Sequence, residues 1–323
     1  MPKNILVTGA TGFIGQHLVR ALIENDHKVR IFVRNEEKAK NIFGDNIEFQ
    51  IGDISDEEKI KYSLNGIDLV YHLAANRGET KLLKKEDYFK NNVLPTRILC
   101  NYCLEKGIKL IYLSSSGVNG WQKDLPINEK CSYLGKGLYH WSKIESEKEI
   151  LSFIDKGLNA VIVRTVMVYG NGDNGFLYKL INLIKHRRFI IIGSGENRIH
   201  LLDVDYLVQG LLKMIDLTRR GEIYYMADEA PININDLTEI ISDKFNVGIP
   251  AVKLPLFLSK IIALFLDNLS AIIKIEFPIS MASVDLLTKD RYYSTEKAKR
   301  DLGFVGGNVK QYIESMHVEN SEN

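Results

Sequence analysis

The first 170 residues alternate short apolar runs with longer stretches in which apolar residues recur every three or four positions. In Phe13–Glu24, for example, Ile14, Leu18 and Leu22 fall on one face of a helix. The short runs are rich in β-branched residues, which favours strands. We expect strands at Ile5–Thr8, Val29–Val33, Ile47–Ile51, Leu69–Leu73, Leu110–Leu113, Ala160–Arg164 and Ile223–Ala227. Strands separated by helices predict a doubly wound α/β fold, a parallel sheet with helices on both faces.

The alternation weakens after Tyr169-Gly170. Residues 171–203 are expected to form loop and helix, and residues 231–323 are expected to be mostly helical. Neither an internal repeat nor a flexible linker separates the two regions. We therefore predict a sheet domain of residues 1–170 and 204–230, with a smaller, mostly helical lobe of residues 171–203 and 231–323 packed on it.

An apolar segment between Pro255 and Pro278 is interrupted by Lys260, Asp267 and Lys274. These charges make a membrane-spanning helix unlikely. Because they are seven residues apart, they form one narrow stripe on a helix, and large apolar side chains cover most of the rest. Such a wide apolar surface needs a partner. The segment packs on the body of the lobe, forms a lid over the substrate or contacts a membrane surface. We expect burial against the lobe, with the charged stripe outward and without bilayer binding.

Composition and charge narrow the class of protein. Apolar residues make up 45% of the chain and charged residues 26%, as in ordinary globular proteins, and the net charge is only +1. No global field therefore recruits nucleic acid or an anionic membrane. The three cysteines and the absence of a secretory signal predict a reducing, cytoplasmic location. Cys100 and Cys103 lie in a helical run without a second pair, so we expect them to face the core and expect no metal site.

The first predicted strand runs directly into a glycine-rich turn and then a helix. Three glycines in such a turn allow a tight bend and a close approach of the backbone to a pyrophosphate, and the helix N-terminus supplies N–H donors. The alternative is a βα turn that binds nothing. We predict a dinucleotide site formed by Gly9, Thr11, Gly12, Phe13, Ile14 and Gly15.

Two further strand ends would border that dinucleotide. Asp53, with Ile54, follows the third strand, where its carboxylate either accepts from an adenine amino group or caps a helix. The fourth strand ends in small residues that let a cofactor approach, and His72 just before them is predicted to be structural. This second group is Leu73, Ala74 and Ala75.

Tyr139 and Lys143 are the main catalytic candidates. Four residues apart on a helix, the phenol and the ammonium lie on one face. A free tyrosine has a pKa of about 10, and a nearby ammonium favours the phenolate, which lets Tyr139 exchange a proton near neutral pH. Ser115 ends the fifth strand, at the sheet edge where doubly wound folds bind ligands. A solvated Tyr/Lys pair would show the same spacing without any catalytic role.

Together these motifs resemble the extended short-chain dehydrogenase/reductases, the NAD(P)-dependent epimerase/dehydratase group, over nearly the whole chain. The resemblance implies a Rossmann domain that binds NAD(P), a substrate-binding lobe and commonly a homodimer. It rests on Thr8–Gly15, Asp53, His72–Ala75, Asn91-Asn92-Val93, Ser114–Gly120, Tyr139–Lys143, Arg164, Val168-Tyr169-Gly170, Gly193–Asp205 and Ala298–Phe304.

The resemblance also implies roles for single residues. Tyr139 would be the acid/base, while Lys143 would bind the nicotinamide ribose and lower the pKa of that tyrosine. Ser115 would contact the substrate oxygen, and Asn92 would support Lys143. The three loop glycines would hold the pyrophosphate and Asp53 would lie at the adenine.

One departure from the family narrows the reaction. Family 4,6-dehydratases carry Thr-Asp-Glu where this chain has Ser115-Ser116-Gly117, so the acid and base of dehydration are missing. Epimerisation, reduction or dehydrogenation at one carbinol carbon needs only hydride transfer and a proton from Tyr139.

A nucleoside-diphosphate sugar is the favoured substrate, because Arg198 resembles the family arginine that holds the diphosphate. Ser115, Ser116, Asn174 and Arg198 are the predicted substrate contacts. A 3β-hydroxysteroid-type or other lipophilic-alcohol dehydrogenase is the alternative. A non-catalytic NADP-binding regulator is a third, and the Tyr/Lys pair disfavours it.

The end of the second strand bears on the choice of cofactor. NAD enzymes of this fold usually place an acid there to bind the ribose 2′-hydroxyl. Here Val33 takes that place and Arg34 follows, and a guanidinium suits a 2′-phosphate. We therefore expect NADP(H) rather than NAD(H).

Overall fold

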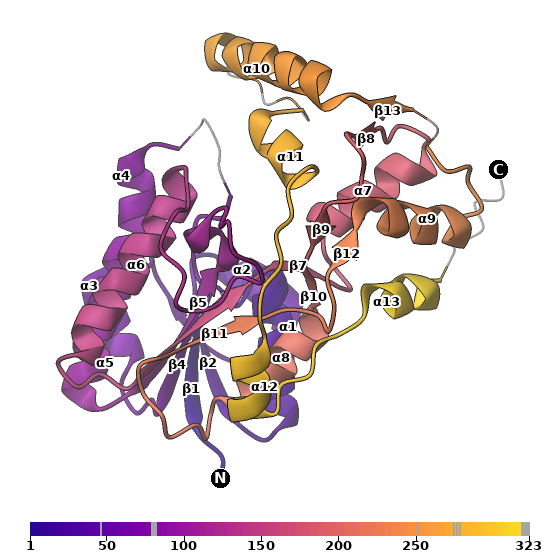
Figure 1. The fold of residues 1–323 in the computed structure, drawn as a ribbon. Helices are drawn as coiled ribbons and strands as arrows, with labels where there is room; N and C mark the ends of the chain where they lie inside the picture. Colours follow the sequence, from indigo (N-terminus) through magenta and orange to yellow (C-terminus); the bar gives the residue numbers. More distant parts are fainter. Residues whose placement is uncertain are drawn as a thin grey trace.

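The computed structural model describes residues 1–45, 47–78, 83–250, 252–273, 275, 277 and 279–317. Its centre is a seven-stranded parallel sheet in the order β11-β6-β5-β4-β1-β2-β3 (Figure 1). All seven predicted strands are present, and the doubly wound fold is confirmed. They are β1 (Asn4–Thr8), β2 (Lys28–Val33), β3 (Glu48–Ile51), β4 (Leu69–His72), β5 (Lys109–Ser115), β6 (Ala160–Thr165) and β11 (Glu222–Met226).

Helices cover both faces of this sheet because its strands are apolar on both. Ile5 and Val7 of β1 belong to one core cluster, with α1 (Phe13–Glu24) and α8 (Val204–Lys213). Leu6 belongs to the other, which α3, α5 and α6 cover. The remaining helices of this part are α2 (Glu36–Phe43), α3 (Glu57–Ser63), α4 (Lys85–Tyr88), α5 (Leu94–Lys106) and α6 (Leu138–Ile154).

A second core holds the smaller lobe together. Buried apolar residues of α7 (Phe176–Lys185), α9 (Ile234–Lys244) and α13 (Val309–Ser315) form it. Pairs of short strands connect segments of the lobe. Each strand has only two or three residues, which is too few to show a periodicity in the sequence. They are β7 (Met167–Tyr169) with β10 (Leu201–Asp203), β9 (Arg198–Ile199) with β12 (Ile232–Asn233), and β8 (Ile191–Ile192) with β13 (Lys253–Leu254).

Part of the C-terminal region packs on the sheet instead of on the lobe. The helix α12 (Glu296–Leu302) lies against β11. Ala298 and Phe304 belong to the same core cluster as β1 and α1. The chain therefore returns from the lobe to the sheet before α13.

The predicted helix in the apolar segment exists as α10 (Leu256–Ile273), but its expected orientation is wrong. Small residues face the protein: Ser259, Ala263 and Ser270 are buried. The carboxylate of Asp267 also turns inward and accepts the Met281 N–H at 2.9 Å. Large apolar side chains point outward, while the small residues of the inner face pack on α11 (Met281–Leu286) beneath.

Lys274, the third member of the predicted charged stripe, lies outside the described residues. Among the helices that the structure describes, none is long and apolar enough to cross a membrane.

The C-x-x-C pair is buried in the core, as predicted. Cys100 and Cys103 lie on α5 with free thiols. Burial raises the pKa of Cys103 to about 12 and that of Cys100 well above its usual range, so both thiols stay protonated. Across the described part of the chain, no group of three or more His, Cys, Asp or Glu side chains is arranged to hold a metal ion.

Candidate active site

The glycine turn between β1 and α1 has no room for side chains. A Cβ on Gly15 would lie 2.2 Å from the Gly9 carbonyl oxygen, and one on Gly9 would lie 2.7 Å from the Ala74 nitrogen. Gly9 also has a φ of +73°, which favours glycine. No side-chain hydrogen bond caps α1 at Gly12, so its first N–H groups stay available for a phosphate. This cradle fits a dinucleotide.

Two adjoining hollows open along the carboxyl edge of the sheet at this turn. The larger is a cleft of about 740 Å³, and the smaller, of about 170 Å³, shares Thr11, Leu73 and Ala75 with it. The predicted residues that line the cleft are Thr11, Gly12, Phe13, Ile14, Gly15, Leu73, Ala75, Ser115, Tyr139, Lys143 and Asn174. The smaller hollow adds Gly9, Arg34, Ile54 and Ala74.

Two cations in the cleft, Lys38 and Arg77, were not predicted from the sequence. Arg77 follows the small residues at the end of β4, and this position could have predicted that it lies at the carboxyl edge of the sheet. Lys38 belongs to α2 and carries no motif that would have marked it.

Lys143 is fixed against the strand that carries Ser115. Its ammonium donates to the Leu113 carbonyl at 2.8 Å and to the Tyr112 hydroxyl at 3.2 Å. Burial lowers the pKa of Lys143 to about 7, and the carboxylate of Glu147, one turn further along α6, acts in the opposite direction. The lysine therefore sits near the border between its charged and neutral forms, as groups in active sites often do.

Ser115 and its neighbours have distinct surroundings. The Ser115 hydroxyl oxygen accepts the Gly117 N–H at 3.1 Å, and Ser115 lines the cleft. Ser114 donates to Glu147 at 2.5 Å. Ser116 lines a separate cavity of about 40 Å³ beside the cleft, which shares Val166 and Met167 with it.

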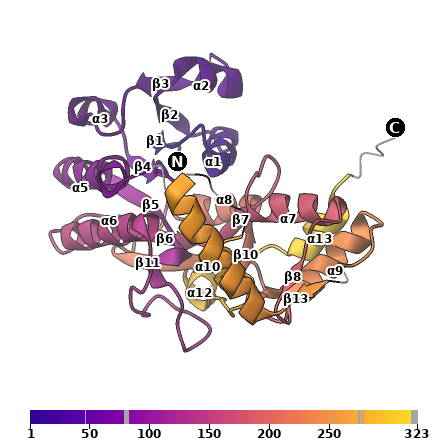
Figure 2. The ribbon, with the colours of Figure 1, turned by 90° about the horizontal axis from the view of Figure 1, so that it is seen from above.

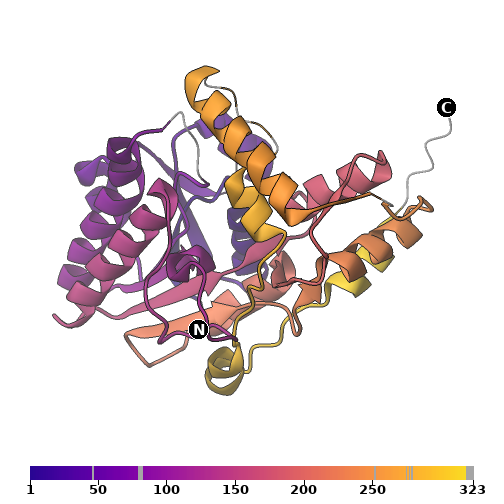
Figure 3. The same ribbon diagram turned by 45° about the horizontal axis from the view of Figure 1, so that its top comes forward.

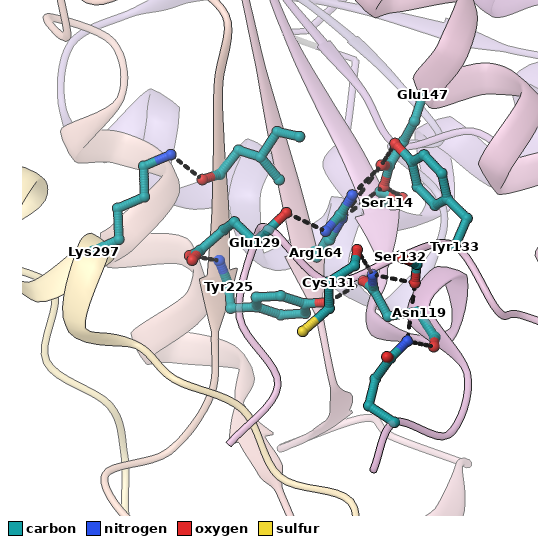
Figure 4. Close-up of polar contacts among 12 residues, drawn as sticks. Ser114, Asn119, Glu129, Cys131, Ser132, Tyr133, Glu147, Arg164, Tyr225 and Lys297 are labelled. Atoms are coloured by element: carbon teal, nitrogen blue, oxygen red, sulfur yellow. Dashed lines mark hydrogen bonds and ion pairs between the residues drawn. The ribbon is translucent and has the colours of Figure 1, made fainter. Parts of the chain in front are cut away.

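Behind the cleft lies a buried ion pair, shown in Figure 4. The Arg164 guanidinium donates to both oxygens of Glu147 at 2.7–3.3 Å, and neither residue is more than 1% exposed. Tyr133 donates to the same carboxylate at 2.8 Å. Since Glu147 also accepts from Ser114, this pair ties α6, which carries Tyr139 and Lys143, to β5 and β6.

The Asn92 side chain is hydrogen-bonded to Asn76 and Ser142 and makes no direct hydrogen bond to Lys143. It lies in a π-helical turn, Phe89–Val93, of a kind that is frequent at functional sites. Its side chain accepts the Asn76 N–H at 2.7 Å and donates to the Ser142 hydroxyl at 2.8 Å. Asn92 thereby joins the loop after β4 to α6.

His72 is structural, as predicted. It is buried between the hydroxyls of Thr8 at 2.7 Å and Thr96 at 3.1 Å. Burial lowers the pKa of His72 to about 3, with Lys143 acting in the same direction, so the ring is neutral.

Two of the predicted ligand contacts have other partners. Arg198 lies outside the cleft, where it pairs with Asp290 at 3.4 Å and stacks over the Tyr292 ring. Asp53 accepts from the Ser55 N–H and hydroxyl, and these hydrogen bonds lower the pKa of Asp53. Its neighbour Ile54 lines the smaller hollow.

His140 fills the space where an acid would stand in a dehydratase. A Cβ on Gly117 would lie only 2.1 Å from the His140 ring nitrogen Nε2. The ring is fixed by a 2.7 Å hydrogen bond between its Nδ1 and the Lys136 carbonyl oxygen. A glutamate therefore does not fit at position 117.

The Rossmann sheet, the glycine cradle and the Ser115, Tyr139 and Lys143 side chains in one cleft define an NAD(P)-dependent enzyme of the extended short-chain dehydrogenase/reductase type. The chain belongs to the NAD dependent epimerase/dehydratase family, whose model matches residues 5–227.

Individual relatives cover nearly the whole chain. A 4-hydroxy-2-methyl-3-oxo-4-farnesyl-3,4-dihydroquinoline-1-oxide ketoreductase of Stigmatella aurantiaca is 24% identical, over 93% of this chain and 91% of its own. An N-acetyl-alpha-D-glucosaminyl-diphospho-ditrans,octacis-undecaprenol 4-epimerase of Escherichia coli O157:H7 is 26% identical over 94% and 91%. The solved UDP-N-acetylglucosamine 4-epimerase of Methanobrevibacter ruminantium M1, in complex with UDP-N-acetylmuramic acid, is 25% identical, with a TM-score of 0.77 over 97% and 96%.

Proposed function

We propose that this protein is an epimerase or ketoreductase that acts at one carbinol carbon of a nucleoside-diphosphate sugar. The observation that carries the proposal is the single cleft shared by Ser115, Tyr139, Lys143 and the glycine cradle. Oxidising or reducing a carbinol needs a nicotinamide and a proton-transfer group at the same carbon, and this cleft has room for both. The similarity to a UDP-sugar epimerase supports the substrate class.

The nicotinamide, when bound, supplies or accepts the hydride. The chain's own residues handle the proton. The Tyr139 phenol oxygen takes the proton from the substrate hydroxyl or returns it, and the positive charge of Lys143 favours the phenolate. The Ser115 hydroxyl donates to the same substrate oxygen and fixes its position. Ser116 and Gly117 supply no acid or base for dehydration, and the His140 ring occupies the space beside Gly117. The reaction therefore stays at one carbon.

For the cofactor, we propose NADP(H) rather than NAD(H). Arg34 lines the smaller hollow, and Val33 offers no carboxylate to a ribose 2′-hydroxyl. Titration of both cofactors into the wild type and Arg34→Ala tests this. The variant should lose about tenfold or more in NADP(H) affinity and little in NAD(H) affinity. Tighter binding of NAD(H) than of NADP(H) by the wild type would overturn the assignment.

A lipid-borne substrate is the second candidate, and two observations favour it. Arg198 is engaged with Asp290, outside the cleft that would hold a diphosphate. Two relatives are named for substrates with farnesyl or undecaprenyl chains. On this alternative the carbinol is part of a lipophilic alcohol or of a sugar on a polyprenyl diphosphate.

A substrate panel separates the candidates. UDP-glucose, UDP-N-acetylglucosamine, a polyprenyl-diphosphate sugar and a sterol are incubated with each nicotinamide, while epimer formation and absorbance at 340 nm are followed. Tyr139→Phe should lower kcat about 10²–10⁴-fold with cofactor binding retained, because it removes only the transferable proton. Tyr178→Phe, on the exposed side of α7, is the matched control. A Tyr139→Phe variant that keeps more than about a tenth of kcat contradicts the role of Tyr139.

A further inference from the structure

The outer face of α10 is an exposed apolar ridge. Phe257 and Phe265, the two phenylalanines of the helix, are 77% and 65% exposed. Figures 2 and 3 show α10 lying across the outside of the molecule, and Figure 1 shows α11 beneath it. The ridge is completed by four exposed aliphatic residues, Leu256, Leu258, Ile261 and Leu264.

The size of the ridge argues against a second copy of this chain as its partner. At about 200 Å² for a phenylalanine, the two rings expose about 280 Å², and the aliphatic side chains raise the total to roughly 600 Å². This is the upper end of what a monomer exposes in one patch. A stable protein interface needs about 800 Å² on each partner and a complementary shape, and a single convex helix supplies neither.

Its charges match an anionic lipid surface. Lys253 and Lys260 are exposed at the start of the ridge and within it. The one acid of α10, Asp267, is turned inward onto Met281. An in-plane membrane helix combines phenylalanine and leucine on one side with lysines near the headgroups, and a bilayer accepts it without a matching shape.

The ridge also lies close to the substrate side of the site. The inner face of α10 packs on α11, and Ala263 meets Val284 there. Leu286, at the end of α11, lines the small cavity that shares Val166 and Met167 with the cleft. In Figure 1, β1 begins near the N-terminus at the bottom, and α10 lies at the top, beyond the other end of the strands.

We infer that the outer face of α10 binds the surface of an anionic bilayer, with the helix parallel to the membrane plane. Phe257 and Phe265 enter the acyl boundary, while Lys253 and Lys260 contact the headgroups. Binding in this orientation brings the substrate side of the cleft to the membrane surface. This surface property does not depend on which carbinol the enzyme acts on.

Vesicle co-sedimentation of the full chain tests the inference. Vesicles of phosphatidylcholine alone and with 30% phosphatidylglycerol are compared, and the fraction of protein pelleted is measured. The wild type should pellet with the anionic vesicles. Phe257→Asp/Phe265→Asp should lose more than tenfold in apparent affinity, and Lys260→Glu about fivefold on anionic vesicles alone.

Tyr62→Asp is the matched control, because Tyr62 is 67% exposed on α3 in the sheet domain. It should pellet like the wild type. Circular dichroism and cofactor titration of each variant confirm that the fold and the nicotinamide site are unchanged.

A wild type that stays in the supernatant with both vesicles would overturn the inference. So would a ridge variant that pellets like the wild type. A concentration-dependent dimer in light scattering that disappears with Phe265→Asp, together with no pelleting, would assign the ridge to a second copy of the chain instead.

Discussion

The buried pair of Glu147 and Arg164 gives a prediction whose size follows from the structure. Three hydrogen bonds of 2.7–3.3 Å join the guanidinium to the carboxylate, and both side chains are shielded from water. Burial alone would lower the pKa of Arg164, but the hydrogen bonds and charge of Glu147 raise it. Arg164 therefore stays charged in the fold and depends on its partner.

Glu147→Leu leaves that charge buried and unpaired. Breaking a buried pair in this way costs about 3–5 kcal/mol, which is a large part of the 5–15 kcal/mol that stabilises a typical domain. Replacing both partners by apolar residues removes the charge itself and is often close to neutral. Ser114 and Tyr133 still lose their acceptor, at about 1 kcal/mol for each hydrogen bond. Because both variants lose these two hydrogen bonds, Glu147→Leu/Arg164→Met should be more stable than Glu147→Leu by about 3–5 kcal/mol.

Urea unfolding followed by circular dichroism measures the free energy of unfolding of the wild type, the two single variants and the double variant. The four values form a thermodynamic cycle, and residues in one network typically give a coupling energy of about 0.5–3 kcal/mol. A Glu147→Leu variant within about 1 kcal/mol of the wild type would refute the reasoning, since a buried unpaired guanidinium cannot be that inexpensive. Additive single effects would equally refute it.

Two further predictions test the glycine cradle and the buried carboxyl group of Asp228. Gly15→Ala should weaken nicotinamide binding at least about tenfold and lower the Tm, because the added Cβ would lie 2.2 Å from the Gly9 carbonyl oxygen. Gly248→Ala is the control, since Gly248 lies in open space. Equal nicotinamide affinities of the two variants would contradict the steric argument. Asp228→Asn should stabilise the protein above pH 7 and not below pH 4, as followed by urea unfolding across that range. Burial raises the pKa of Asp228 from 3.8 to about 7, so the wild type loses stability as the pH rises through this window, by at most about 4 kcal/mol. A stability difference that does not change with pH would contradict a protonated Asp228.

Local sequence was sufficient to predict the sheet domain. Interior strands of the sheet, such as β4 and β6, are buried on both faces and read as apolar runs, and the crossover helices show their own period. The glycine cradle was equally predictable, because its conformation is set by Gly9, Gly12 and Gly15 within one turn. The Tyr139 and Lys143 pair follows from the four-residue spacing of a helix alone.

Tertiary structure decided what depends on partners far along the chain. Arg198 resembles a diphosphate ligand by its motif, and in the fold it pairs with Asp290, 92 residues later, and does not line the cleft. Asn92 was expected to support Lys143, and in the fold its side chain links Asn76 to Ser142.

The orientation of α10 shows the physical reason most clearly. A helical period reveals which residues share a face, but not which face meets the protein. In the fold, Ser259, Ala263 and Ser270 turn inward, with Ala263 packed on Val284 of α11, and the phenylalanines turn outward. The sequence alone determined that the two faces differ. Only the packing of α10 on α11 decided that the apolar one is exposed.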